Sequence, residues 1–133
     1  MNAMDPNLDP RLDDLFLASY EVGGRGHGRF DCFGLFAEVQ RRAGVPVKAY
    51  VTPEDWAGRE AEILAGAQQW LKLDGPEPWC AVVFRVGRFV AHMGVVLADG
   101  AHFIHADKHI GIARARLDDA RWAQRIAGYY RHV

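Results

Sequence analysis

Cys32 is the side chain in this sequence best placed for nucleophilic chemistry, because it lies where the glycine-rich loop 23–28 runs into a helical pattern. At a helix N-terminus, free backbone N–H groups and the positive end of the helix dipole favour thiolate over thiol. The same N–H groups could hold an oxyanion. We therefore predict that Cys32 is a nucleophile. Burial as a structural thiol is the competing interpretation.

Two histidines are predicted to lie close together on one face of a β-hairpin. Asp99-Gly100 favours a two-residue turn. That turn pairs residue 94 with 105 and 92 with 107, so His92 and His105 become diagonal neighbours about 7–8 Å apart at Cα. We predict that His92 is the base for Cys32 and that His105 fixes its tautomer. Asp107, directly opposite His92, is the reserve orienting group.

A metal site is the rival interpretation of these residue types. However, His102, His105 and His109 lie within a predicted strand and the turn after it, where their side chains do not converge on one face. The sequence also has no Cys-x-x-Cys element. We predict no metal and no other cofactor. Cys80 is interpreted as a strand residue, and both cysteines as reduced.

The composition is that of an ordinary globular protein, with 133 residues, 50% hydrophobic residues and a net charge of −1. This charge gives no bulk attraction to nucleic acid. No apolar run has the length of a membrane span. Residues 1–14 are acidic and lack the apolar segment of a secretory signal, so we expect a chain made in the cytoplasm.

The elements that must position these residues indicate one α+β domain over residues 1–133. N-terminal helices are expected to pack on an antiparallel sheet of about five strands. We expect residues 1–9 to be loose and a short helix to begin at Pro10. A second helix should begin near Cys32, with Asp31 as its cap and Gly44-Val45-Pro46 as its stop.

The second half of the chain is predicted to be an insertion followed by strands. Residues 52–74 are expected to form a helical insertion that Thr52 caps and that Gly58 and Gly66 break into two pieces, with its tryptophans in the core. A helical turn within 117–124 should hold Trp122 against the core. The predicted strands are 81–86, 89–98, 101–106, 110–115 and 126–132.

Taken together, these motifs resemble the NlpC family of papain-like cell-wall cysteine peptidases. The matching pieces run through the chain in order: Tyr20, Gly23-Gly24, Asp31-Cys32-Phe33-Gly34-Leu35, Arg42-Ala43-Gly44-Val45, His92-Met93-Gly94-Val95-Val96-Leu97, Phe103-Ile104-His105-Ala106, Trp122 and Gly128-Tyr129-Tyr130-Arg131. The resemblance implies a papain-like fold with Cys32, His92 and His105 in the roles above. It places Tyr20 and Asp31 beside the nucleophile as oxyanion or positioning groups.

The resemblance also implies a substrate and a setting. The substrate would be peptidoglycan stem peptide, cut at the bond between D-glutamate and the diamino acid. A short domain with a helical insertion looks most like versions from phage tails, prophages and gene transfer agents, so tail-tip proteins are expected partners. Two departures are Phe33, where recycling members carry serine, and Trp79-Cys80, where many members have Gly-Asp. The alternatives are a structural tail-assembly protein and an amidase or acyltransferase using the same thiol.

Overall fold

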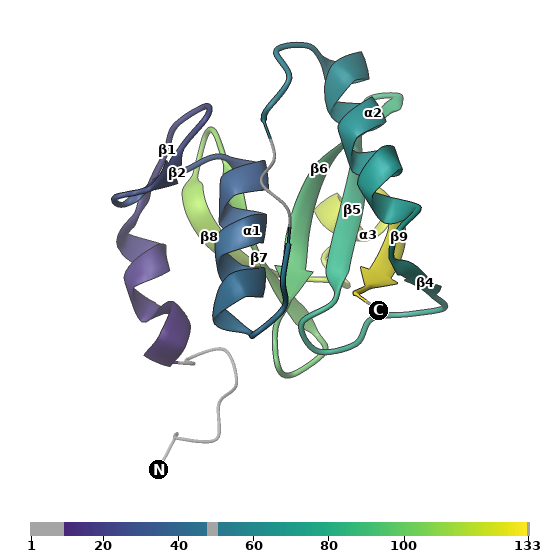
Figure 1. The fold of residues 1–133 in the computed structure, drawn as a ribbon. Helices are drawn as coiled ribbons and strands as arrows, with labels where there is room; N and C mark the ends of the chain where they lie inside the picture. Colours follow the sequence, from purple (N-terminus) through teal and green to yellow (C-terminus); the bar gives the residue numbers. More distant parts are fainter. Residues whose placement is uncertain (1–9, 48–50, 133) are drawn as a thin grey trace.

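The computed structural model describes residues 10–47 and 51–132, and its centre is a six-stranded antiparallel sheet (Figure 1). In spatial order the strands are β4 (Leu71–Leu73), β9 (Ile126–Arg131), β5 (Ala81–Val86), β6 (Phe89–Val96), β7 (His102–Asp107) and β8 (Gly111–Arg116). Five of them lie within two residues of the predicted strands. The α+β class is confirmed, but the sheet is larger than expected because Leu71–Leu73 pairs with β9.

Helices cover both faces of the sheet. Helices α1 (Cys32–Arg42) and α2 (Trp56–Ala67) lie on one face, and the short α3 (Ala120–Ala123) lies on the other (Figure 1). A 3-10 helix, η2 (Pro10–Leu17), precedes them. Within the described ranges no helix is long and apolar enough to cross a membrane. The prediction for residues 1–9 lies outside the described residues.

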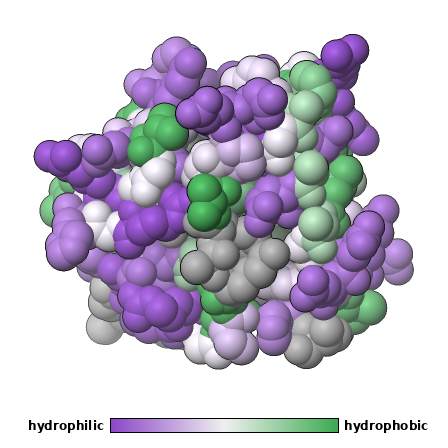
Figure 2. All heavy atoms as spheres, turned by 45° about the horizontal axis from the view of Figure 1, so that its top comes forward, coloured by the Kyte–Doolittle hydropathy of each residue, from purple (hydrophilic) through white to green (hydrophobic). Residues whose placement is uncertain are grey.

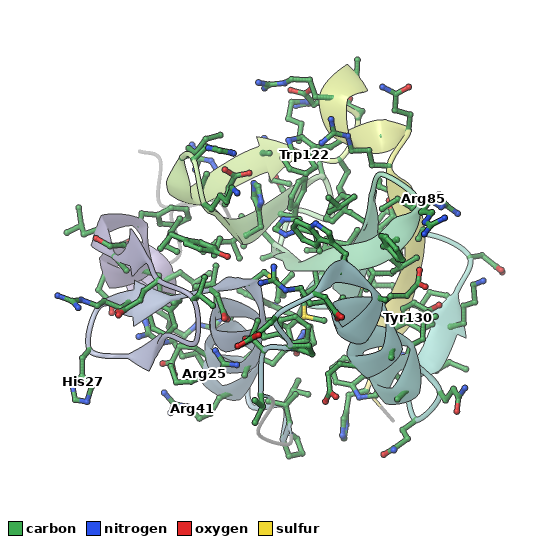
Figure 3. The ribbon with its side chains drawn as sticks, turned by 90° about the horizontal axis from the view of Figure 1, so that it is seen from above. Arg25, His27, Arg41, Arg85, Trp122 and Tyr130 are labelled. Atoms are coloured by element: carbon green, nitrogen blue, oxygen red, sulfur yellow. The ribbon has the colours of Figure 1, made fainter. Side chains whose placement is uncertain are left out.

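Two hydrophobic clusters fix the helices to the sheet. One cluster joins α1 and α2 to the sheet, through side chains that include Leu35, Phe36, Val39, Ile63, Val83, Val95 and Ile104. The other lies under α3 and contains Val82, Phe84, Val96 and Phe103, with Trp122 packed against them. Burial of each large apolar side chain contributes about 1.5–3 kcal/mol. Figure 3 shows Trp122 across the sheet from Arg25, which lies beside α1.

The loop before Cys32 is held by a small sheet of its own. The strands β1 (Ser19–Tyr20), β3 (Arg29–Phe30) and β2 (Arg25–Gly26) form a three-stranded sheet in that order. Residues 27 and 28 both have positive φ values, 56° for His27 and 76° for Gly28, which the tight turn between β2 and β3 requires. The loop is therefore a β-hairpin that delivers the chain to the start of α1.

The insertion differs from the sequence prediction in three ways. Helix α2 begins at Trp56 and is capped by Asp55, whose carboxylate accepts from the Gly58 N–H, so Thr52 is not the cap. The helix is continuous through Gly58 and Gly66. After Ala67 the chain returns to the sheet as β4, because extended pairing with β9 replaces further helix.

The predicted hairpin register between β6 and β7 is confirmed. Val95 pairs with Ile104 and Val96 with Phe103, as the Asp99-Gly100 turn requires. The ladder consists of these two pairs, although both strands run on toward His92 and Asp107. The ends of β6 and β7 beyond the ladder contribute side chains to the site described below.

Candidate active site

A pocket of about 380 Å³ lies at the end of the sheet where α1 and α2 begin. It contains Cys32 from α1, His92 from β6 and Tyr20 from β1. Ala91 and Ala106 also line it, from the parts of β6 and β7 that run beyond their ladder. The surface turned forward in Figure 2, which includes the end where α1 and α2 begin, is dominated by hydrophilic side chains.

Asp31 fixes the loop to the start of α1. Its carboxylate is completely buried and accepts four hydrogen bonds. The donors are the Gly34 N–H at 2.9 Å, the Gly23 N–H at 2.7 Å, Arg25 Nη1 at 2.8 Å and the Thr52 hydroxyl. The predicted cap is confirmed. Both carboxylate oxygens are already occupied, so Asp31 holds the scaffold and does not face the pocket as a free group.

The Cys32 thiol is neutral in this arrangement, contrary to the expected thiolate. Burial, and next the charge of Asp31, raise the pKa of Cys32 to about 12. The charge of Arg59 and backbone hydrogen bonds from Met93 and Phe33 lower the pKa, but by less. The sequence argument counted the helix N-terminus and omitted desolvation, which here is the larger effect.

His92 and His105 form the predicted pair. His92 Nε2 lies 2.9 Å from His105 Nδ1, so one imidazole donates to the other. This contact leaves Nδ1 of His92 available for a second partner. Burial, and next the charge of His105, lower the pKa of His92 to about 3. Burial lowers the pKa of His105 to about 4. Both rings are therefore neutral near pH 7.

Aromatic packing sets the orientation of the two imidazoles. The Trp122 ring stacks on His92 at 5.8 Å between centroids and meets His105 edge-on at 4.7 Å. Phe84 and Phe103 complete this box at 5.6 Å from His92 and 4.9 Å from His105 respectively. The pairing of β5 with β6 shifts register beside His92, which leaves Ala91 as an extra residue. Such bulges often re-aim a side chain near a site.

Cys32 and His92 are brought to one pocket from opposite faces of the sheet. Cys32 belongs to the cluster under α1, whereas His92 pairs with Phe84 in the cluster under α3. Both side chains line the pocket. No hydrogen bond joins the Cys32 sulfur to either ring in the described part of the chain.

Tyr20 and Asp107 both line the pocket, with different surroundings. Burial, and next the charge of Cys32, raise the pKa of Tyr20, so its hydroxyl remains a donor at neutral pH. Burial alone would raise the pKa of Asp107, but N–H donors from His109 and Ile110 keep it lowered. Asp107 thus caps the β7–β8 turn and acts on the imidazoles through charge, without a direct bond to His92.

Of the other histidines His109 lines the pocket, whereas His102, His27 and the second cysteine lie apart from it. His102 Nδ1 contacts Asp99 in the hairpin turn at 2.6 Å, and His27 points away from the body of the molecule (Figure 3). Cys80 is a free thiol buried under α3, outside the pocket lining. Phe33 is fully buried in the first cluster. Among the described residues, no group of three or more His, Cys, Asp or Glu side chains could hold a metal ion.

The sequence analysis missed two pocket residues in the insertion. Trp56 was expected in the core, yet it is 43% exposed and lines the pocket. Arg59 lies over its ring, with Cζ 4.8 Å from the centroid. The spacing of three residues on a predicted helix could have suggested this stacking. Its place in the pocket could not be predicted, because it depends on how α2 packs on β6.

Solved structures share this fold at low sequence identity. A Staphylococcus aureus protein described as similar to lipoprotein, NLP/P60 family, has a TM-score of 0.63 and 20% identity, over 99% of this chain and 42% of its own. NlpC1 from Trichomonas vaginalis has a TM-score of 0.64 and 15% identity, over 92% and 44%. A Bacillus cereus NlpC/P60 family protein has a TM-score of 0.62 and 17% identity, over 90% of this chain and 39% of its own. This chain therefore spans less than half the length of each.

A search among curated proteins found no match to the sequence. The model of the NlpC/P60 family matches residues 18–131, a range that contains Tyr20, Cys32, His92 and His105. Members of this family are typically cysteine peptidases of the cell wall. Because the match covers most of the sequence and the fold agrees with structures from the same family, this chain belongs to the NlpC/P60 family.

Proposed function

We propose that this chain is a cysteine peptidase that hydrolyses peptide bonds in peptidoglycan stem peptides. Cys32 is the nucleophile, His92 the general base and His105 the group that orients His92. The observation that carries the proposal is the pocket, which holds the thiol together with an imidazole already hydrogen-bonded to a second imidazole. This is the nucleophile, base and orienter arrangement of thiol hydrolases.

The hydrogen bond between the histidines is compatible with the tautomers that this role requires. For His92 to act as a base, its Nε2–H donates to His105 Nδ1, and His105 carries its own proton on Nε2. Nδ1 of His92 is then the acceptor for the thiol proton. His105 holds the ring in this tautomer, as the buried aspartate does in a serine protease.

The proposed reaction proceeds through a thioester. The Cys32 sulfur attacks the scissile carbonyl carbon while His92 takes the thiol proton. The carbon–nitrogen bond then breaks, and the same proton passes from His92 to the leaving amine. A water molecule next attacks the thioester, gives a proton to His92, and releases the carboxylic acid as the thiol recovers its proton. The neutral resting groups favour this general-base sequence over a preformed thiolate–imidazolium pair.

Tyr20 is the proposed donor to the oxyanion of the tetrahedral intermediate. It lines the pocket together with Cys32, and its raised pKa keeps the hydroxyl protonated. Asp31 contributes indirectly, by holding the loop and the first turn of α1 in place. The negative charge of Asp107 raises the pKa values of both imidazoles and so offsets part of the lowering that burial causes.

The bond between D-glutamate and the diamino acid is the proposed site of cleavage. We place the protein in a phage, prophage or related tail particle that acts at the cell wall, after synthesis in the cytoplasm. The support for both statements is the sequence resemblance described above. Mass analysis of the products tests the first, and detection of the chain in purified particles tests the second.

A non-catalytic tail-assembly protein is the second candidate function. The raised pKa of Cys32 and the lack of a hydrogen bond from its sulfur to an imidazole, within the described residues, favour this alternative. An amidase or acyltransferase would use the same thiol and differ in its products. Amidase products are cut at the sugar–peptide junction, whereas peptidase products are cut within the stem.

The deciding experiment is digestion of purified peptidoglycan by wild type, Cys32→Ala, His92→Ala and the matched control Cys80→Ala. Wild type and Cys80→Ala should release stem fragments. Cys32→Ala and His92→Ala should lose about 10³-fold or more in rate. Cleavage by folded Cys32→Ala at the wild-type rate would contradict the proposal. If none of the four proteins, wild type included, digests peptidoglycan and Cys32→Ala also fails to assemble into particles, the structural role is favoured.

A further inference from the structure

The pocket is strongly cationic, a property that the catalytic roles above do not use. Its lining contains four basic side chains and one carboxylate, Asp107. The basic side chains are Arg59, Arg85, Lys108 and Arg125. Within the described residues none of the four forms an ion pair with an acidic side chain. A concave site lined by one sign of charge attracts ligands of the opposite sign.

Arg59 is the most firmly held of these cations. Its Nε donates to the Pro53 carbonyl oxygen at 2.9 Å, and its guanidinium lies over Trp56. These contacts use the face of the guanidinium and one of its donors. Its Nη groups, which make no hydrogen bond to a described residue, remain for a ligand. A planar guanidinium with its orientation fixed in advance is well suited to a carboxylate.

Two arginine–tryptophan pairs line the pocket. Arg59 with Trp56 acts on the thiol, and Arg125 with Trp122 acts on the imidazole. The charge of Arg59 acts on both Cys32 and Tyr20, lowering their pKa values against the larger effect of burial. Arg125 lies over Trp122, with Cζ 5.6 Å from the ring centroid, and its charge acts on His92. Arg59 therefore shares the pocket lining with Cys32, and its charge acts on the thiol that is the proposed nucleophile.

We propose that Arg59 binds a free carboxylate on the acyl side of the scissile bond and selects substrates that carry one. This inference rests on the proposed function, since it assigns a substrate feature to the same site. D-Glutamate joined through its side-chain carboxyl carries such a free carboxylate next to the acyl chain. D-Isoglutamine, its amidated form, does not. Arg59 therefore discriminates between amidated and non-amidated stems.

The first test needs no peptidase activity. Cys32 is alkylated with iodoacetate, an anion, and with iodoacetamide, its neutral counterpart, and the adducts are mapped by peptide mass. Arg59→Gln should lower the ratio of iodoacetate to iodoacetamide rates at Cys32 by about threefold or more. Arg59→Lys should retain most of the ratio, and the ratio at Cys80 should not change.

Arg88→Gln is the matched control, because Arg88 lies over Phe89 at 4.9 Å and is not part of the pocket lining. It should leave the ratio at Cys32 at the wild-type value. An unchanged ratio in Arg59→Gln would overturn the proposal. Failure of both reagents to reach Cys32 would also overturn it, because an anion must reach the thiol and Arg59 together.

The second test uses paired stem peptides that contain D-glutamate or D-isoglutamine. Wild type should prefer the D-glutamate peptide, and Arg59→Gln should reduce that preference by about tenfold or more, mainly through KM. Equal preference in both proteins would contradict the role of Arg59. If neither peptide is cleaved by wild type, the proposed function fails, while the alkylation ratio still decides whether Arg59 selects anions.

Discussion

The two halves of the candidate site are held in place by different interactions. On the thiol side, buried polar contacts converge on Asp31, which connects the loop, α1 and the start of the insertion. On the imidazole side, aromatic rings enclose His92 and His105. Within the described residues, the contact between the two rings is the one side-chain hydrogen bond that either ring makes. A charged hub, Asp31 with its donors, therefore positions the proposed nucleophile, and an apolar box of aromatic rings positions the proposed base.

This difference teaches how each half should respond to perturbation. The hub requires both its carboxylate and its donors to be present, so loss of one partner leaves others buried without a bond. The aromatic box requires its imidazoles to be neutral, so added protons act against it. We therefore expect substitutions at Asp31 to report on the thiol side, and a fall in pH to report on the imidazole side.

Asp31→Ala is expected to cause the largest loss. It removes four hydrogen bonds from a completely buried carboxylate and leaves the partly exposed Arg25 without this acceptor. We expect the free energy of unfolding to fall by about 3 kcal/mol. Urea unfolding measures this change. Asp14→Ala is the control, since Asp14 is 68% exposed beside Arg42 and its loss should cost about 1 kcal/mol or less. Equal losses of unfolding free energy in Asp31→Ala and Asp14→Ala would contradict the role of Asp31 as the hub.

Acid is expected to destabilise the imidazole side. The folded pKa values of His92 and His105, about 3 and about 4, lie below the unfolded value of about 6.5. Between these values the unfolded chain binds more protons, so stability is complete above pH 6.5 and falls as the pH falls. The slope should approach about 1.4 kcal/mol per pH unit for each histidine.

Unfolding midpoints measured across this pH range test the prediction. His92→Gln should reduce the slope, because a glutamine cannot take up the proton. His27→Gln, on a side chain that points away from the molecule (Figure 3), should keep the wild-type slope. A slope that His92→Gln and His105→Gln both leave unchanged would show that the two rings are not held neutral.

Thr52→Val is expected to cause the smallest effect. The Thr52 hydroxyl donates to Asp31 and accepts from Arg25 Nη2 at 2.8 Å, so valine removes two contacts at the rim of the hub. We expect a loss of about 1 kcal/mol in the free energy of unfolding. A loss as large as that of Asp31→Ala would mean that the insertion, not the carboxylate, holds the loop.

Local patterns were sufficient to predict much of the fold and the histidine pair. The Asp99-Gly100 turn determines the register of β6 and β7, and a period of two then places His92 and His105 on one face. The start of α1 followed from Asp31, because capping involves residues three positions apart. These predictions needed only neighbours in sequence or a short hairpin.

The failed predictions depended on contacts between distant parts of the chain. Strand β4 forms because it pairs with β9, and Thr52 joins the hub 21 positions from Asp31 in place of capping a helix. The pKa of Cys32 was predicted in the wrong direction because burial of the thiol depends on the whole sheet. Arg59 reaches the pocket only through the packing of α2 on β6.

The central claim is that Cys32 and His92 line one pocket as neutral groups, and the pH profile of Cys32 alkylation tests it most directly. Iodoacetamide labelling, mapped to separate Cys32 from Cys80, is measured in wild type and in His92→Ala. We predict that Cys32 reacts more slowly than a free cysteine, whose pKa is about 8.5, and that its rate still rises above that pH in both proteins. Rapid labelling in acid that His92→Ala abolishes would instead demonstrate a preformed thiolate–imidazolium pair and contradict the account.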